Sequence, residues 1–186
     1  MKGSLLPVVA LLAATSIGLY GCGADENPSL SAFLSLHNQF CESDMKSREE
    51  LTAALQADKR FKPAVGFVGV YETKIDEVSY AVSPEIDGCT TDVMVKNNKT
   101  GKLLFTYAEL NDALAEKGYK PFGKETKRKD KGSDLKDVVI LEKSFIAPNG
   151  EKANLDYPAD RPDQYYMTLF AKKFAKAEKS SVSMNN

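Results

Sequence analysis

Runs of β-forming residues follow one another through the middle of the chain, with turn residues and no helix-length segment between them. These runs cover residues 65–72, 77–83, 89–95 and 102–105. Pro84, Gly88 and the stretch Asn97-Asn-Lys-Thr-Gly101 mark turns. We therefore predict an antiparallel meander, because the alternation of strands with helices that builds a parallel sheet is absent.

A second group of strands is expected further along the chain. Residues 138–146 and 151–157 are β-like and are joined by Pro148-Asn-Gly150, which predicts a hairpin. A last strand is expected over the alternating residues Tyr165, Met167, Leu169 and Ala171.

The most polar tract, residues 123–137, carries charges of both signs and predicts a long exposed loop. Within it, the positive charge of Lys127-Arg-Lys129 is offset by nearby acidic residues, so we interpret this segment as solvated rather than as a phosphate-binding site. Residues 175–186 are rich in Lys and Ser, and we expect a disordered tail there.

Three helices are expected beside the strands. The first covers residues 31–41, where side chains recur at helical spacing, at Leu30, Phe33, Leu34, His37 and Phe40. Capping boxes begin two further helices at Ser47 and Thr106, since each is followed three positions later by a Glu that can bond back to the backbone. Gly118 is expected to end the third helix.

These elements predict an α+β fold, with a mostly antiparallel sheet that carries two or three helices on one face. The chain has 186 residues, which allows one domain, and we place it at residues 31–174. The net charge of -1 gives no long-range field to attract nucleic acid, so we expect no nucleic-acid partner.

The N-terminal segment has the features of an export signal. Met1-Lys2-Gly3 is a short cationic start, and residues 5–19 form an apolar stretch that is too short to span a bilayer. Residues 22–30 are small, polar and interrupted by Pro28, which is the composition of a flexible tether. We therefore expect the folded domain to stand away from a membrane surface.

The end of this signal, Leu19-Tyr20-Gly21-Cys22, resembles the lipobox of bacterial lipoproteins. The resemblance implies that residues 1–21 are a signal peptide removed by lipoprotein signal peptidase, and that Cys22 is lipidated with acyl chains such as palmitate. Gly23 and Ala24 follow Cys22, with no Asp immediately after it, which by the family's sorting rule implies the outer membrane, facing the periplasm. A plain secretory leader that ends at a chance Cys is the alternative.

Two further cysteines, Cys41 and Cys89, remain in a chain expected to reach an oxidising compartment. We expect them to form a disulfide bond, and the alternative is a reduced catalytic thiol or a metal ligand. His37 lies four residues before Cys41, so the two could share one helical face as a thiolate–imidazolium pair requires. Nothing else in the sequence supports that pair, and we expect His37 at a helix surface or an interface.

We expect no enzyme activity, metal or cofactor. His37 is the only histidine, which excludes a His-rich metal site, and the carboxylates are too scattered to nominate a hydrolytic pair. Asp156, Asp160 and Asp163 cluster in a Pro-rich turn and could bind calcium, but they lack the EF-hand pattern, so we interpret them as loop residues.

The remaining features favour a non-catalytic protein-binding module, such as an envelope-assembly partner, an inhibitor or an immunity-type protein. Tyr157, Tyr165 and Tyr166 are candidate aromatic anchors for that partner, and ordinary packing is the alternative for each of them. A small-ligand or lipid-binding module with an apolar pocket between helices and sheet is the second possibility. A Cys/His-dependent enzyme is the third.

Overall fold

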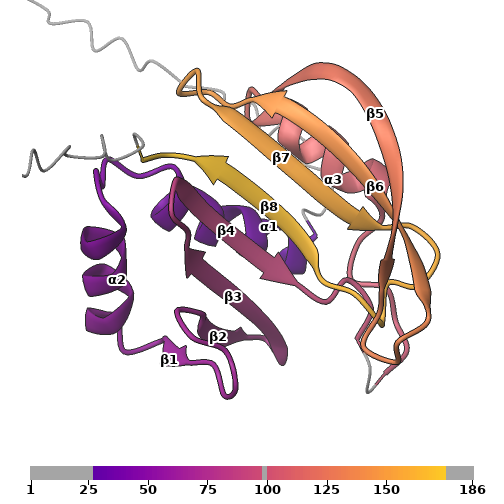
Figure 1. Ribbon diagram of the computed structural model, residues 1–186, viewed down its shortest axis with the longest axis horizontal. Coiled ribbons are helices and arrows are strands. Elements are labelled where there is room, and N and C mark those ends of the chain that lie inside the picture. The colour runs from indigo at the N-terminus through magenta and orange to yellow at the C-terminus, as the bar shows by residue number, and fades with distance from the viewer. Residues whose placement is uncertain (1–26, 98–99, 175–186) are drawn as a thin grey trace, which may run out of the picture.

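The computed structural model describes residues 27–97 and 100–174. In this part of the chain, one eight-stranded antiparallel sheet runs in the order β1-β2-β3-β4-β8-β7-β6-β5 (Figure 1). Its strands are β1 (Lys62–Pro63), β2 (Tyr71–Ile75), β3 (Val78–Pro84), β4 (Gly88–Val93), β5 (Lys120–Lys131), β6 (Asp137–Ile146), β7 (Lys152–Pro158) and β8 (Met167–Lys172). The sheet therefore consists of two meanders, β1–β4 and β5–β7, that the last strand joins by lying between β4 and β7.

The helices are α1 (Pro28–Leu36), which continues into the π-helical turn η1 (His37–Cys41), α2 (Arg48–Ala57) and α3 (Tyr107–Glu116). Figure 1 shows α1 and α3 behind the sheet, and α2 beside it. The expected combination of an antiparallel sheet with helices is confirmed, and the sheet holds the larger share of the described residues.

The first helix begins earlier than expected. The side-chain oxygen of Asn27 accepts hydrogen bonds from the backbone of Ser29 at 3.1 Å and of Leu30 at 3.3 Å, and Pro28 occupies the first turn. Both features favour a helix start. Residues 28–30, which we expected in the tether, are therefore helical, and the side chain of Leu30 is buried.

The core lies between the helices and one face of the sheet. The side chains on one face of the sheet share a buried cluster with residues of all three helices. The sheet residues in this cluster include Tyr80, Val82, Val93, Leu155 and Leu169. The helix residues in this cluster include Phe33, Leu51, Leu55, Leu110 and Leu114. The opposite face of the sheet carries no helix in the described part of the chain, and we call it the open face.

Both capping positions begin helices, but only one capping box is complete. At α3, Thr106 accepts from the backbone of Glu109, and the Glu109 carboxylate accepts from the backbone of Thr106. At α2, Ser47 accepts from the backbone of Glu50 at 3.1 Å, whereas the Glu50 carboxylate accepts from Lys46, one residue before the cap. Gly118 follows α3 with a φ of 88°, as a residue that ends a helix requires.

The expected loop over residues 123–137 is wrong for most of its length, because β5 runs through it to Lys131. This strand lies at the edge of the sheet and pairs only with β6, and its side chains are almost all exposed. Charged residues are favoured on such an edge because they discourage pairing with a second molecule. The polar composition therefore reflects the edge position and not a lack of structure.

The first β-like run was also displaced. Residues 64–70 form a loop, while pairing with β3 begins at Tyr71. Three apolar side chains are exposed in that loop: Val65, Phe67 and Val68. Residues 102–105 form no strand and contribute only an isolated bridge between Lys96 and Leu103.

The predicted disulfide between Cys41 and Cys89 is confirmed. Their α-carbons lie 5.2 Å apart and both residues are buried. The bond ties the end of η1 to the start of β4, and so fixes the first helix against the centre of the sheet. Within the described ranges, no helix is long and apolar enough to cross a membrane.

Candidate functional site

A cleft of about 450 Å³ lies on the open face of the sheet. Its floor is formed by strands β2, β3, β4 and β8, and its walls by the β1–β2 loop and by the segments 131–133 and 164–166. The residues that line it are Phe67, Val70, Glu72, Ala81, Ser83, Asp92, Met94, Lys131, Gly132, Ser133, Gln164, Tyr165, Tyr166 and Thr168. The exposed part of this lining is mainly apolar.

The strand register explains which polar side chains reach this floor. Glu72 lies opposite Ala81, Ala81 opposite Asp92, and Asp92 opposite Thr168, so the four residues form one cross-strand row. Successive side chains of a strand alternate between the two faces of a sheet. Because the neighbours of this row, such as Val82 and Val93, point into the core, the row itself must point into the cleft.

Asp92 is the most perturbed carboxylate of the cleft. The Thr168 hydroxyl donates to one of its oxygens at 2.5 Å, and the Thr90 hydroxyl donates to the other at 3.1 Å. Burial raises the pKa of Asp92 to about 6, against the lowering effect of these two hydrogen bonds, and the nearby charge of Glu85 raises it further. No salt bridge to Asp92 occurs within the described residues.

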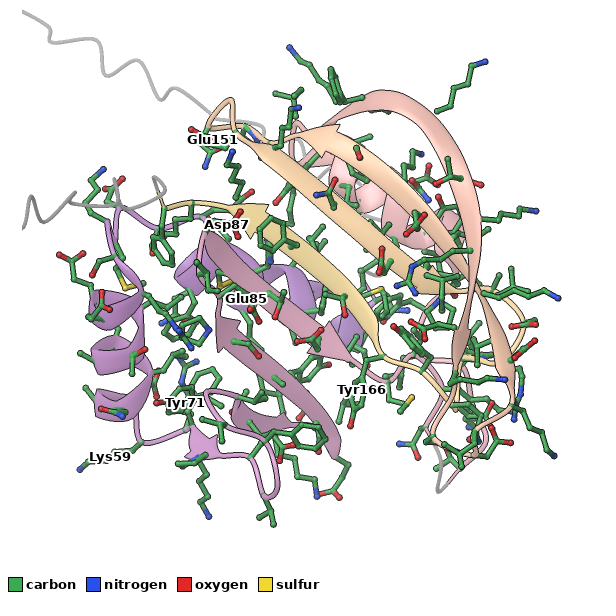
Figure 2. The ribbon with its side chains drawn as sticks, in the orientation of Figure 1. Lys59, Tyr71, Glu85, Asp87, Glu151 and Tyr166 are labelled. Atoms are coloured by element: carbon green, nitrogen blue, oxygen red, sulfur yellow. A yellow bond between two sulfur atoms is a disulfide. The ribbon has the colours of Figure 1, made fainter. Side chains whose placement is uncertain are left out.

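Tyr166 and Phe67 give the cleft its aromatic rim. The side chain of Tyr166 is 49% exposed and that of Phe67 is 65% exposed. Figure 2 shows Tyr166 just beyond the end of β4. Burial raises the pKa of the Tyr166 hydroxyl, and the charges of Glu72 and Asp92 raise it further.

The three tyrosines expected as anchors occupy different environments. Tyr166 lies on the rim, and Tyr165 lines the cleft while its hydroxyl donates to Asp130 at 2.8 Å. Tyr157 is buried on the helix side, where its ring packs against Tyr107. Tyr157 is therefore a core residue, and we no longer consider it for the binding site.

Comparisons with known proteins give no relative from which a function could be carried over. No family model, no curated protein and no solved structure matches this chain. The function must therefore be argued from the cleft and the surfaces around it.

His37 is not at a surface, which corrects our expectation. It is buried in η1, where its Nδ1 lies 3.0 Å from the Thr91 hydroxyl, and the sulfur of Cys41 lies 3.4 Å from the same hydroxyl. Burial lowers the pKa of His37 to about 3, with a smaller contribution from the charge of Lys173. With Cys41 held in the disulfide, this pair offers no free thiol for nucleophilic chemistry.

The aspartates considered for calcium do not converge on one point. Asp156 pairs with Arg128, Asp160 accepts from the backbone of Val139, and Asp163 lies 4.0 Å from the ammonium of Lys96. No group of three potential metal ligands occurs within residues 27–97 and 100–174. Each carboxylate instead serves a local contact.

The cleft itself was missed at the sequence level. Its polar floor comes from single residues on four strands, and its rim comes from loops distant in the chain. The one available signal was Asp92, a charged residue that stands between two buried residues, Thr91 and Val93.

Proposed function

We propose that this protein is an envelope lipoprotein, anchored through lipid on Cys22, whose open-face cleft binds a partner protein without catalysing a reaction. The observation that carries the proposal is the cleft with its exposed aromatic rim, Phe67 and Tyr166. Aromatic residues at the edge of a pocket are frequent anchors of protein interfaces. The leader lies outside the described residues, so the anchor rests on the lipobox resemblance.

The loop beside the cleft supports a protein partner. Val65, Phe67 and Val68 are exposed by 95%, 65% and 103% and are close together in the chain. Neighbouring apolar side chains that protrude from a surface indicate an interaction site, because the burial of each one contributes roughly 1.5–3 kcal/mol. A partner that covers the cleft would bury this loop at the same time.

The edges of the sheet are poor alternatives to the open face. β1 has two residues, one of which is Pro63, and β5 exposes many charged side chains, mostly of Lys. Both features discourage a partner from adding a strand. The open face is therefore the better candidate for recognition.

A small-ligand module is the second candidate, because the cleft volume of about 450 Å³ lies within the range of small-molecule sites. Our expectation had placed such a pocket between helices and sheet, whereas this cleft lies on the other face. The exposed apolar loop next to it favours a macromolecule, since a small ligand would leave Val65 and Val68 in water.

Photocrosslinking in cells that produce the protein tests the binding surface. A benzophenone amino acid in place of Phe67 or Tyr166 is expected to give one and the same protein adduct. The matched control is Phe122, an aromatic residue with 48% exposure that packs near Lys152, away from the cleft. Absence of an adduct from both rim positions, or the same adduct from Phe122, would overturn the proposal.

The anchor is tested separately. Substitution Cys22→Ser is expected to leave the precursor unprocessed and without palmitate label, because the thiol is the acyl acceptor in the family that the leader resembles. Globomycin should have the same effect on processing in the parent. A mature form of the parent that carries no label would contradict lipidation.

A further inference from the structure

We propose that the group received by this cleft is a lysine side chain of the partner, with its methylenes along the apolar walls and its ammonium between Asp92 and Glu72. This inference rests on the proposed function and specifies the chemistry of the same site. It is based on one cross-strand row of carboxylates, of which some are paired with a cation of the protein and others are not.

The cross-strand row that contains Asp92 continues across the rest of the open face. Beyond Thr168 it passes through Asp156 and Glu142, so that one line of paired positions holds four carboxylates. In order from β2, these are Glu72, Asp92, Asp156 and Glu142. Like charges on one face repel each other, so carboxylates in such a row favour a nearby cation.

Arg128 compensates one half of this row. Its guanidinium lies 2.8 Å from Glu142 and 2.6 Å from Asp156, and it also pairs with Asp130. The Tyr165 ring packs against the same guanidinium, with 5.9 Å between the guanidinium carbon and the ring centroid. The carboxylates in this half of the open face are thus compensated by ion pairs within the protein.

The other half has no such cation among the described residues. Neither Asp92 nor Glu72 takes part in a salt bridge, although both border the cleft. Lys131 is the only cationic residue of the lining, and its ammonium pairs with Asp137 at 2.5 Å. The cleft therefore offers two uncompensated carboxylates to a cation supplied from outside.

The apolar lining of the cleft indicates what precedes the ammonium in the bound group. Phe67, Val70 and Met94 line the cleft with apolar surface, which suits the aliphatic stem of a long cationic side chain. The Tyr166 ring lies at the rim, where the face of an aromatic ring attracts a cation.

Lysine fits this floor better than arginine. Both oxygens of Asp92 already accept from hydroxyls, of Thr168 and Thr90, and each oxygen keeps one further lone-pair position. The planar fork of a guanidinium needs the remaining positions of both oxygens in one plane. A compact ammonium needs only one of these positions on Asp92, and the charge of Glu72, two strands away, attracts it at longer range.

The experiment uses n-pentylammonium as a mimic of the lysine side chain and 1-pentanol as its neutral counterpart. Each is titrated into the ¹⁵N-labelled protein at pH 7.5, and the amide shifts of Asp92, Tyr166 and Thr168 are followed. We expect pentylammonium to bind about tenfold more tightly than pentanol, the factor that one charge-assisted hydrogen bond supplies. Asp92→Asn should reduce this preference to about twofold or less.

Two further variants separate the possible failures. Glu72→Gln changes an exposed side chain and is expected to weaken pentylammonium binding in part, whereas Glu151→Gln, in the distant β6–β7 turn, should have no effect (Figure 2). Equal binding of pentylammonium and pentanol would overturn the charge inference and leave the proposed protein-binding function standing. If neither probe binds, the lysine inference is overturned as well. The proposed protein-binding function is tested separately, by the crosslinking experiment.

Discussion

The hydroxyl of Thr168 donates a hydrogen bond of 2.5 Å to Asp92, the residue directly opposite it on the neighbouring strand. Thr90 donates to the other oxygen of the same carboxylate. Asp92 is therefore held in place by neutral groups alone, and its charge remains uncompensated at the floor of the cleft. Such a carboxylate can be dispensable for the fold and still be important for recognition.

Asp92→Asn should stabilise the protein at neutral pH. Because the pKa of Asp92 is raised to about 6 in the fold from 3.8, the folded state binds the proton more tightly, and this contribution to stability is lost as the pH rises from about 4 through 6. The variant should thus exceed the parent by about 2 kcal/mol in unfolding free energy at pH 7.5 and match it at pH 4. Urea unfolding measures this, and a difference between the two proteins that does not change with pH would contradict it.

The other charges near Asp92 do not confuse this comparison. Glu85 contributes to the raised pKa of Asp92, and Glu72 and Tyr166 face the same cleft. All three groups are present in both the parent and the variant. The pH dependence of the difference in unfolding free energy between the two proteins therefore reports on Asp92.

His37 should produce the opposite dependence on pH. Burial and the charge of Lys173 lower its pKa to about 3 in the fold, so the unfolded chain alone takes up the proton below pH 6.5, and stability is lost as the pH falls from 6.5 towards 3. In His37→Gln, the loss of unfolding free energy between pH 7 and pH 5 should be smaller than in the parent by about 2 kcal/mol. Urea unfolding at the two pH values measures this. An unchanged loss would show that His37 is accessible to protons in the fold.

The sequence predicted those features of the fold that depend on local pattern. The strands at residues 78–84, 88–93 and 137–146 were predicted to within two residues at each end, because turn residues separate the β-like runs there. Thr106 and Glu109 marked a helix start because both halves of a capping box lie within four consecutive residues. The disulfide followed from the count of cysteines and the expected compartment.

What failed depends on the position of an element in the sheet. β5 was missed because none of its side chains is buried, so its sequence lacks the apolar alternation that identifies a strand. Residues 64–70 gave the opposite error. Their apolar side chains predicted a strand, whereas these side chains, such as Phe67, are exposed in a loop beside the cleft. The row from Glu72 to Asp92 required the strand register, which pattern alone does not determine.

The Cys41–Cys89 bond should be a stabilising crosslink. Replacement of both residues by Ala should lower the unfolding free energy by about 2–5 kcal/mol, as for other disulfides that close a loop of this kind. Urea unfolding of the parent with and without reductant provides the control, because the reduced parent should approach the variant. A variant as stable as the oxidised parent would show that packing alone holds η1 against β4.

Tyr165 and Tyr166 are neighbours in the chain, and their substitutions should separate binding from folding. Tyr166 is half exposed on the rim, so Tyr166→Ala should weaken association with the crosslinked partner by about 2 kcal/mol or more and change the unfolding free energy by less than about 1 kcal/mol. Tyr165 donates to Asp130 and packs against Arg128, so Tyr165→Ala should chiefly lower stability. Titration calorimetry with that partner and thermal unfolding of both variants measure the two effects, with Phe122→Ala as an exposed aromatic control. If Tyr166→Ala binds the partner as the parent does while Phe122→Ala does not, the binding surface lies at the β5 edge and not at the cleft.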